Sequence, residues 1–256
     1  WITYNGEAFN YIELREELVR KGYQFSTGTD TEVVLALYEE YGAQCLEKIN
    51  GQFAFAIWDT RTESLFLARD RVGIRPLFYT QKDGKFSFAS EIKAIFSDPS
   101  VPRKIDTEAL SQIFTFWTTI TPKTSFSDIY ELPPGHFMTV SSTGVSKPMA
   151  FWSIPYVVEE ERWQGSFAEA EEELRGLLKD AVRLRLRADV PVGAYLSGGL
   201  DSSILTALIA KNFNNKLRTF SLSFQESSFD ESAYQNEMVR YLQTDHSDVK
   251  VSNQHI

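Results

Sequence analysis

Cysteine and histidine are scarce in this sequence. The 256 residues include a single cysteine, Cys45, and three histidines. One cysteine cannot form an internal disulfide, and these few residues show no Cys/His spacing typical of a structural zinc site. We therefore expect the protein to work in a reducing compartment.

Long apolar runs and a leader pattern are also absent. The sequence contains no run of about 18 apolar residues, and its N-terminus has no charged stretch followed by an apolar core. We predict neither a membrane span nor a signal peptide, and hence a cytoplasmic protein. Because the first residue is Trp1 and not Met, we expect the chain to be a fragment of a longer protein.

Positive charge is in the minority. The chain carries 26 Lys and Arg residues against 35 Asp and Glu residues, a net charge of −9. This balance argues against a nucleic-acid backbone as the main partner. The 43% hydrophobic and 14% aromatic residues can form a large core, and the length suits two domains.

Residues 1–155 follow the pattern of an α+β domain. The segment 53–58 is apolar on both alternating faces, so we expect a strand that is covered on both sides. This favours a layered sandwich of sheets and helices. Helices are predicted over 11–21, 31–41 and 107–117, and strands over 23–27, 53–58, 64–68, 76–80 and 85–89. A turn at 132–136 is expected to lead into a further short strand that ends at Val140.

Residues 160–256 alternate between strand and helix patterns. We place the domain boundary near 156–165, before a long amphipathic helix. The alternation predicts a doubly wound parallel α/β domain, in which ligands bind where strands end and helices begin. Strands are predicted over 192–196, 217–224 and 247–251, and helices over 167–186, 202–211 and 231–242.

The most specific motif is Ser-Gly-Gly-Leu-Asp-Ser-Ser at residues 197–203. Its glycines let backbone N–H groups approach an anion, its serines add donors, and the following helix begins there, as in a phosphate-binding loop. It is neither GxxxxGK[ST] nor GxGxxG. Asp201 suits a ligand for Mg²⁺ carried on the phosphates. The alternative is an ordinary glycine-rich turn with a serine cap.

This motif resembles the pyrophosphate-binding loop of the ATP pyrophosphatases, and among them the glutamine-hydrolysing asparagine synthetases. Further segments resemble successive motifs of that family's glutaminase domain, in family order over nearly the whole chain. They are residues 5–10 (NGEAFN), 28–32 (GTDTE), 53–59 (FAFAIWD), 68–79 (ARDRVGIRPLFY) and 89–94 (ASEIKA). The resemblance implies a glutaminase over 1–155 and an ATP-binding synthetase domain over 160–256.

The resemblance also implies a glutamine pocket. Asn5 and Gly6 would donate to the oxyanion, while Glu7 and Asp30 would hold the α-amino group, a role that suits carboxylates. From the residues alone, two other interpretations stay open. Asn5-Gly6 is a common turn dipeptide, and Asp30 could cap a helix that begins at Thr31.

For ATP, the resemblance implies a second set of residues. The ATP site would comprise Leu196, Ser197, Gly198, Gly199, Asp201, Ser202, Ser203 and Leu222, with Asp201 as the metal ligand. Leu222 could equally be a strand core residue. Residues 229–231 resemble the acidic start of the next helix in the family.

The family reaction joins aspartate to AMP, releases pyrophosphate, and lets ammonia from glutamine attack the activated carboxyl group. The resemblance thus implies ATP and Mg²⁺ as cofactors, glutamine and aspartate as substrates, and a homodimer. The family nucleophile is an N-terminal cysteine that precedes the pocket motifs. Cys45 follows them, so we predict a buried structural thiol at Cys45 and no glutamine hydrolysis by this chain alone.

Two rival functions stay open. The first is a related amidotransferase that acts on a different carboxylate acceptor. The second is a non-catalytic module that senses glutamine or a nucleotide. Aspartate-dependent release of pyrophosphate separates the first rival from the synthetase.

Overall fold

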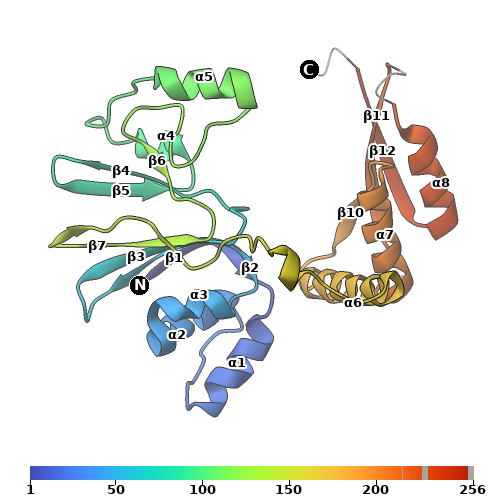
Figure 1. Cartoon of the computed structure of the whole chain (residues 1–256), viewed down its shortest axis with the longest axis horizontal. Helices are drawn as coiled ribbons and strands as arrows, with labels where there is room; N and C mark the ends of the chain where they lie inside the picture. Colours follow the sequence, from blue (N-terminus) through green and yellow to red (C-terminus); the bar gives the residue numbers. More distant parts are fainter. Residues whose placement is uncertain (215, 227–229, 253–256) are drawn as a thin grey trace. The chain divides into compact units, whose positions relative to one another are not determined.

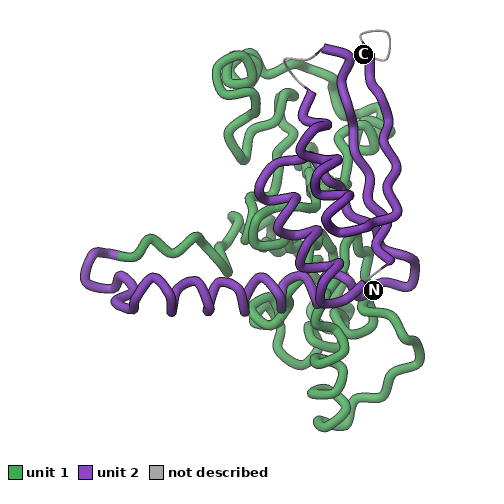
Figure 2. Tube along the Cα trace, turned by 90° about the vertical axis from the view of Figure 1, so that its right-hand side faces the viewer, with its two compact units in different colours: residues 1–157 green, residues 158–256 purple. Residues whose placement is uncertain are grey.

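The structure is a computed structural model that describes residues 1–214, 216–226 and 230–252. The chain divides into two compact units, residues 1–157 and residues 158–256, which Figure 2 shows in different colours. Each unit has its own sheet structure.

An antiparallel sheet forms the centre of the first unit (Figure 1). Its strand order is β1-β2-β3-β7-β8, and β9 also pairs with β7. The strands are β1 (Ile2–Ala8), β2 (Gly51–Asp59), β3 (Ser64–Arg69), β7 (His136–Ser141), β8 (Gly144–Val145) and β9 (Met149–Ala150). In the ladder between β1 and β2, Asn5 lies opposite Ala54 and Gly6 lies opposite Phe53.

Helices pack on one face of this sheet. They are α1 (Tyr11–Arg20), α2 (Asp30–Tyr41), the short 3₁₀ turn η1 (Gly42–Gln44) and α3 (Cys45–Lys48). Leu14, Leu18 and Leu37 of these helices are buried with Phe53 and Phe55 of β2 in one core. The apolar side chains of α1 and α2 therefore face the sheet, and their burial stabilises the packing of the helices on the sheet.

A second, small antiparallel sheet lies beyond the other face. Its order is β5-β4-β6, formed by β4 (Phe78–Lys82), β5 (Lys85–Ala89) and β6 (Tyr130–Glu131). Ala54 and Ala56 of β2 are buried there with Leu77, Leu132 and Met138. The prediction that 53–58 is covered on both sides is confirmed for residues 53–57, whereas Trp58 at the end of the segment is 41% exposed. The helices α4 (Ile92–Ile95) and α5 (Thr107–Phe116) complete the unit.

A buried carboxylate organises the loop after β3. Asp70 is 0% exposed. Its Oδ1 accepts hydrogen bonds from the backbone N–H groups of Val72 (3.2 Å) and Ile74 (3.0 Å). Its Oδ2 accepts from those of Phe53 (3.1 Å) and Arg75 (3.0 Å). Because both oxygens are used, the loop between the two sheets is fixed to β2 by one side chain.

The second unit contains a parallel sheet of order β10-β11-β12. Its elements are η2 (Glu159–Glu161), α6 (Phe167–Arg185), β10 (Gly193–Tyr195), α7 (Leu200–Asn212), β11 (Arg218–Phe224), α8 (Ser232–Leu242) and β12 (Asp245–Val251). A capping box of Ser166 and Glu169 begins α6. The predicted α/β class is confirmed, with α7 and α8 as the crossover helices between parallel strands.

Two predicted strands of the first unit differ from the structure, and one strand was missed. Residues 23–27 form no strand, because the N–H groups of Ser26 and Thr27 donate to the Glu32 carboxylate and not to a neighbouring strand. The strand expected at 76–80 runs from Phe78 to Lys82, since Pro76 has no N–H group for a ladder. The strand β1 was not predicted at all.

Candidate functional site

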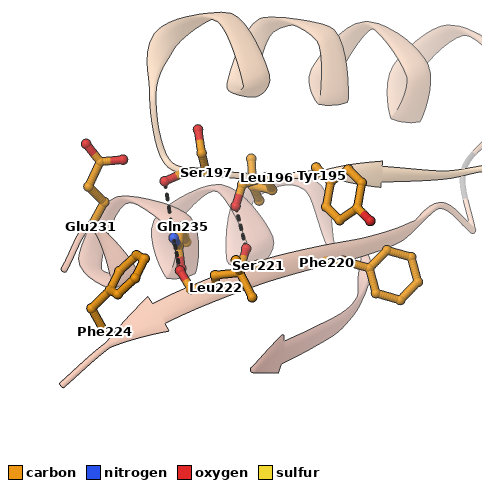
Figure 3. A pocket seen from close by; sticks show the side chains of 9 residues that line it. All are labelled: Tyr195, Leu196, Ser197, Phe220, Ser221, Leu222, Phe224, Glu231 and Gln235. Atoms are coloured by element: carbon orange, nitrogen blue, oxygen red, sulfur yellow. Dashed lines mark hydrogen bonds between the residues drawn. The ribbon is translucent and has the colours of Figure 1, made fainter. Parts of the chain in front are cut away.

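The loop of residues 197–203 connects the end of β10 to the start of α7 (Figure 3). Just before it, the N–H group of Leu196 donates to the carbonyl of Phe220 across 2.8 Å, so the loop begins where the ladder with β11 ends. Gly198 has a φ of +91°, a conformation that favours glycine. The predicted strand, loop and helix order is therefore present.

Serine hydroxyls shape this loop from within. The N–H group of Ser197 donates to Oγ of Ser202 (3.2 Å), and the two hydroxyl oxygens lie 2.9 Å apart. Ser202 Oγ in turn donates to the carbonyl of Gly199 (3.1 Å). Gly199 is the N-cap of α7 and supplies no side-chain cap. The first turn of α7 therefore lacks the usual side-chain acceptor at the end that attracts anions.

Asp201 lies exposed in that first turn. Its carboxylate bonds to no other residue in the described part of the chain. The described residues also contain no cluster of three or more His, Cys, Asp or Glu side chains that could hold a metal. A single free carboxylate fits Mg²⁺, because this ion commonly takes one or two carboxylates together with phosphate oxygens and water.

A cavity of about 300 Å³ lies beside the loop, at the carboxyl ends of β10 and β11. Leu222 is 53% exposed, so in this structure it is not a core residue. Ser203, at the end of the motif, lies within the first turn of α7. The cavity is lined by Tyr195, Leu196, Ser197, Phe220, Ser221, Leu222, Phe224, Glu231 and Gln235.

Sequence reasoning missed Gln235. Its side chain reaches from α8 to both strand ends, where Nε2 donates to the carbonyls of Ser197 (3.1 Å) and Leu222 (3.0 Å), as Figure 3 shows. Glutamine on a helix is usually exposed, so nothing local marked this residue. Of the motif at 229–231, residue Phe229 lies outside the described residues. The pKa of Asp230 is lowered, chiefly by the hydroxyl of Ser232.

In the first unit, Asn5, Gly6 and Glu7 are consecutive residues of β1. Their strand conformation excludes the turn interpretation of Asn5-Gly6. A Cβ atom at Gly6 would lie 2.2 Å from the carbonyl oxygen of Gln52, so only glycine allows this close approach of β2. Strand alternation directs Asn5 toward the second sheet, where it lines a cavity of about 250 Å³ together with Ala54 and Ser90.

Asp30 is the first residue of α2 and is not its cap. The cap is Thr29, whose hydroxyl accepts from the N–H group of Glu32 (3.4 Å). The Asp30 carboxylate instead lies against β1, where Oδ2 accepts from the Tyr4 hydroxyl (3.1 Å) and the Ala8 N–H group (2.8 Å). Asp30 thus accepts hydrogen bonds from the residue before and the residue after the segment 5–7.

The charge of the Asp30 carboxylate affects the pKa of the Tyr4 phenol. Burial is the main cause that raises the pKa of Tyr4, followed by the charge of Asp30, with a smaller contribution from Glu7. Asn5 lines the cavity between the sheets, whereas Asp30 belongs to the helical layer. The structure therefore gathers Asp30, Tyr4 and Ala8, and it directs the Asn5 side chain elsewhere.

Cys45 is fully buried, and burial raises the pKa of its thiol to about 12. A thiol that stays protonated is a poor nucleophile. The prediction that Cys45 is a buried structural thiol is confirmed.

Two protein families match successive parts of the chain. Residues 1–152 match the family of the glutamine amidotransferase domain, and the chain belongs to this family. Residues 173–256 match the family of asparagine synthase. The resemblance to the glutamine-hydrolysing asparagine synthetases is thus confirmed.

The chain is similar to two named relatives. The chain is 42% identical to asparagine synthetase [glutamine-hydrolyzing] 3 of Bacillus subtilis, over 91% of this chain and 38% of the relative. It is 39% identical to asparagine synthetase [glutamine-hydrolyzing] 1 of the same organism, over 90% of this chain and 36% of the relative. The chain thus spans less than two fifths of the length of these relatives.

Among solved structures, a glutamine phosphoribosylpyrophosphate amidotransferase from B. subtilis, complexed with ADP and GMP, matches at 21% identity and a TM-score of 0.42. The match covers 85% of this chain and 44% of that chain. In the described part of the chain, no helix has both the length and the apolar character that crossing a membrane requires.

Proposed function

We propose that this chain is part of a cytoplasmic, homodimeric enzyme that makes asparagine from aspartate with ATP and the amide nitrogen of glutamine. The single observation that carries the proposal is the loop of residues 197–203. It joins a parallel strand to a helix without a side-chain cap, carries an unpaired carboxylate at Asp201, and follows a glutamine amidotransferase domain in the same chain.

In the proposed synthetase reaction, a carboxylate oxygen of aspartate attacks the α-phosphorus of ATP, and pyrophosphate leaves with the electron pair of the broken P–O bond. Ammonia then attacks the acyl carbon, and AMP leaves. Those backbone N–H groups of residues 197–203 that are not bonded within the loop, together with the hydroxyl of Ser203, would hold the phosphates, with Leu196 and Leu222 beside the nucleoside. Asp201 would hold Mg²⁺, which offsets phosphate charge when bound.

In the proposed glutaminase reaction, Asn5 and Gly6 donate to the oxyanion that forms on the glutamine amide. The carboxylates of Glu7 and Asp30 bind the α-ammonium group. Support comes from Asp30, which is not needed as a helix cap and whose Oδ2 is already fixed by Tyr4 and Ala8.

The test is the release of pyrophosphate from ATP by the full-length protein, measured with glutamine and with or without aspartate. We expect release that requires aspartate. In the Asp201→Ala variant it should fall by roughly 10²-fold, as expected for loss of a group that stabilises transferring phosphates.

Asp189→Ala is the matched control, because Asp189 is an exposed aspartate of the same unit outside the loop. Pyrophosphate release without aspartate would identify a different carboxylate acceptor. Absence of release under all conditions, with intact ATP binding, would favour a sensing module.

A further inference from the structure

Gln235 of α8 is a buried polar residue in the second unit. It is only 4% exposed, although it belongs to a helix whose neighbouring residues Tyr234 and Asn236 are exposed. We infer that Gln235 is the positioning residue of the nucleotide site, where it fixes the phosphate loop relative to the strand end that carries Leu222. This inference rests on the proposed function of the loop.

Gln235 makes two hydrogen bonds through its side-chain amide. Its Nε2 has two hydrogens, and both go to backbone carbonyls, at Ser197 (3.1 Å) and Leu222 (3.0 Å). Carbonyl oxygens only accept hydrogen bonds, so the amide group has one possible orientation. A side chain buried in this way contributes two bonds that no apolar residue can replace.

The backbone pairing between β10 and β11 ends close to the carbonyl groups that Gln235 binds. The ladder between β10 and β11 pairs Tyr195 with Phe220, and the Leu196 N–H group still donates to the carbonyl of Phe220. Beyond Leu196 the chain leaves the sheet and turns into the phosphate loop. Gln235 therefore connects the segment after β10 to β11 at the point where their backbone pairing ends. The hydroxyl of Ser221 adds a hydrogen bond to the carbonyl of Leu196.

Gly198 of the loop lies close to the first residues of α8. A Cβ atom there would lie 3.1 Å from the carbonyl oxygen of Glu231 and 3.3 Å from Cγ of Gln235. The loop thus rests directly on the start of α8. A shift of the Gln235 side chain would therefore change its packing against Gly198. It would also move the carbonyl group of Ser197, the first residue of the loop.

A bound nucleotide would contact both the loop at Ser197 and the strand end at Leu222, which Gln235 connects. Free pyrophosphate would contact only the loop. Loss of Gln235 should therefore weaken the interaction with ATP more than the interaction with pyrophosphate. A general loss of folding would affect both, together with the binding of glutamine by the other unit. This difference separates a positioning role from a structural one.

The experiment uses the full-length protein and the variants Gln235→Met and Gln235→Glu. The control is Asn236→Ala, on the exposed side of the same helix. For Gln235→Met we expect the KM for ATP to rise about tenfold, in line with the effect of small misplacements in active sites. The KM of Gln235→Met for glutamine should stay at the parent value. The control Asn236→Ala should keep the unfolding midpoint of the parent. Inhibition by pyrophosphate should weaken less than about threefold.

Gln235→Glu keeps the shape of the side chain and adds a pH readout. The protonated carboxyl group can still donate one hydrogen bond, but the ionised group donates none and repels both carbonyls. The KM for ATP of this variant should therefore rise with pH, relative to that of the parent. This readout is independent of whether Gln235→Met folds.

Two results would overturn the inference. One is an unchanged KM for ATP in a folded Gln235→Met variant, or in Gln235→Glu at high pH. The other is an equal loss of affinity for ATP, pyrophosphate and glutamine. If the parent protein itself releases no pyrophosphate, the proposed function fails first, and the nucleotide role of Gln235 falls with it.

Discussion

The Tyr4 hydroxyl donates a hydrogen bond to Oδ2 of Asp30 across 3.1 Å. The same oxygen accepts the Ala8 N–H group, so two donors from β1 fix a carboxylate of α2. Burial and the charge of Asp30 raise the pKa of Tyr4 above its ordinary value of 10.0, so the phenol stays a donor even in alkaline solution. Within the described residues Oδ1 accepts no hydrogen bond, and it is the atom that we propose to bind the ammonium group of glutamine.

Tyr4→Phe tests this relationship. It removes one donor and leaves the ring in place, so Asp30 should be held less firmly. In the full-length protein we expect the KM for glutamine to rise about tenfold, with a smaller change in kcat, since one hydrogen bond to a charged group is worth about 1.5 kcal/mol. Kinetics with glutamine as the varied substrate measure this.

The matched control is Tyr23→Phe. The Tyr23 hydroxyl also donates to a carboxylate across 3.1 Å, at Glu40 on the exposed side of the unit. This variant should keep the parent KM. An equal rise in both variants would contradict the proposed role of Asp30.

Gly198→Ala should destabilise the phosphate loop. The residue has a φ of +91°, which costs a residue with a Cβ atom about 1 to 2 kcal/mol, and its Cβ would crowd Glu231. We expect a lower unfolding free energy in urea and weaker ATP binding.

Gly176→Ala gives the opposite expectation within the same unit. Gly176 lies inside α6, and a Cβ atom there would meet nothing within 4 Å. Alanine should stabilise this helix by about 0.5 to 1 kcal/mol. If both variants shifted the urea midpoint in the same direction, the backbone argument for Gly198 would be wrong.

Asp70→Asn should be among the most damaging single-atom changes in the first unit. Each carboxylate oxygen of Asp70 accepts two backbone N–H groups, so an amide nitrogen would face two donors without an acceptor. We expect a loss of about 3 kcal/mol in unfolding free energy, measured by urea denaturation.

Asp106→Asn is the comparison for Asp70→Asn. Asp106 caps α5 through Oδ1 alone, which accepts from Glu108 (2.9 Å) and Ala109 (3.0 Å). Asparagine keeps one acceptor oxygen and is an equally good cap, so the loss should stay below about 1 kcal/mol. Equal losses at the two sites would refute the role of Asp70.

Cys45 should make the protein less stable at high pH. The unfolded thiol loses its proton near its ordinary pKa of 9.0, whereas burial keeps the folded thiol protonated up to about 12. Between these values the unfolded state binds fewer protons, so stability falls as pH rises, by about 1.4 kcal/mol per pH unit. Below pH 9 this effect is absent.

The measurement compares the pH dependence of urea unfolding for the parent and for Cys45→Ala. Between pH 10 and 11 the variant should lose less stability than the parent by about that slope. Ellman's reagent should react with Cys45 only in denaturant. Rapid reaction with the native protein would show that the thiol is accessible.

The sequence predicted best what depends on local order. The strand, loop and helix around Asp201 follow one another along the chain, so their order could be predicted from the sequence. Residues 5–7 were harder, because Asn5-Gly6 is a turn dipeptide and only the distant partner β2 makes it a strand. Gln235 could not be predicted, since its burial depends on carbonyl groups of two other elements.

The pairing of β1 with β2 has a consequence for how the protein is made. β1 pairs along its whole length, from Ile2 opposite Ile57 to Ala8 opposite Gly51, and about forty residues with three helices lie between the two strands. During synthesis β1 leaves the ribosome before its partner exists, whereas β2 and β3 are joined by a short turn. Closing the long loop costs more chain entropy than closing the turn, so the residues proposed to bind glutamine are set in place late in folding.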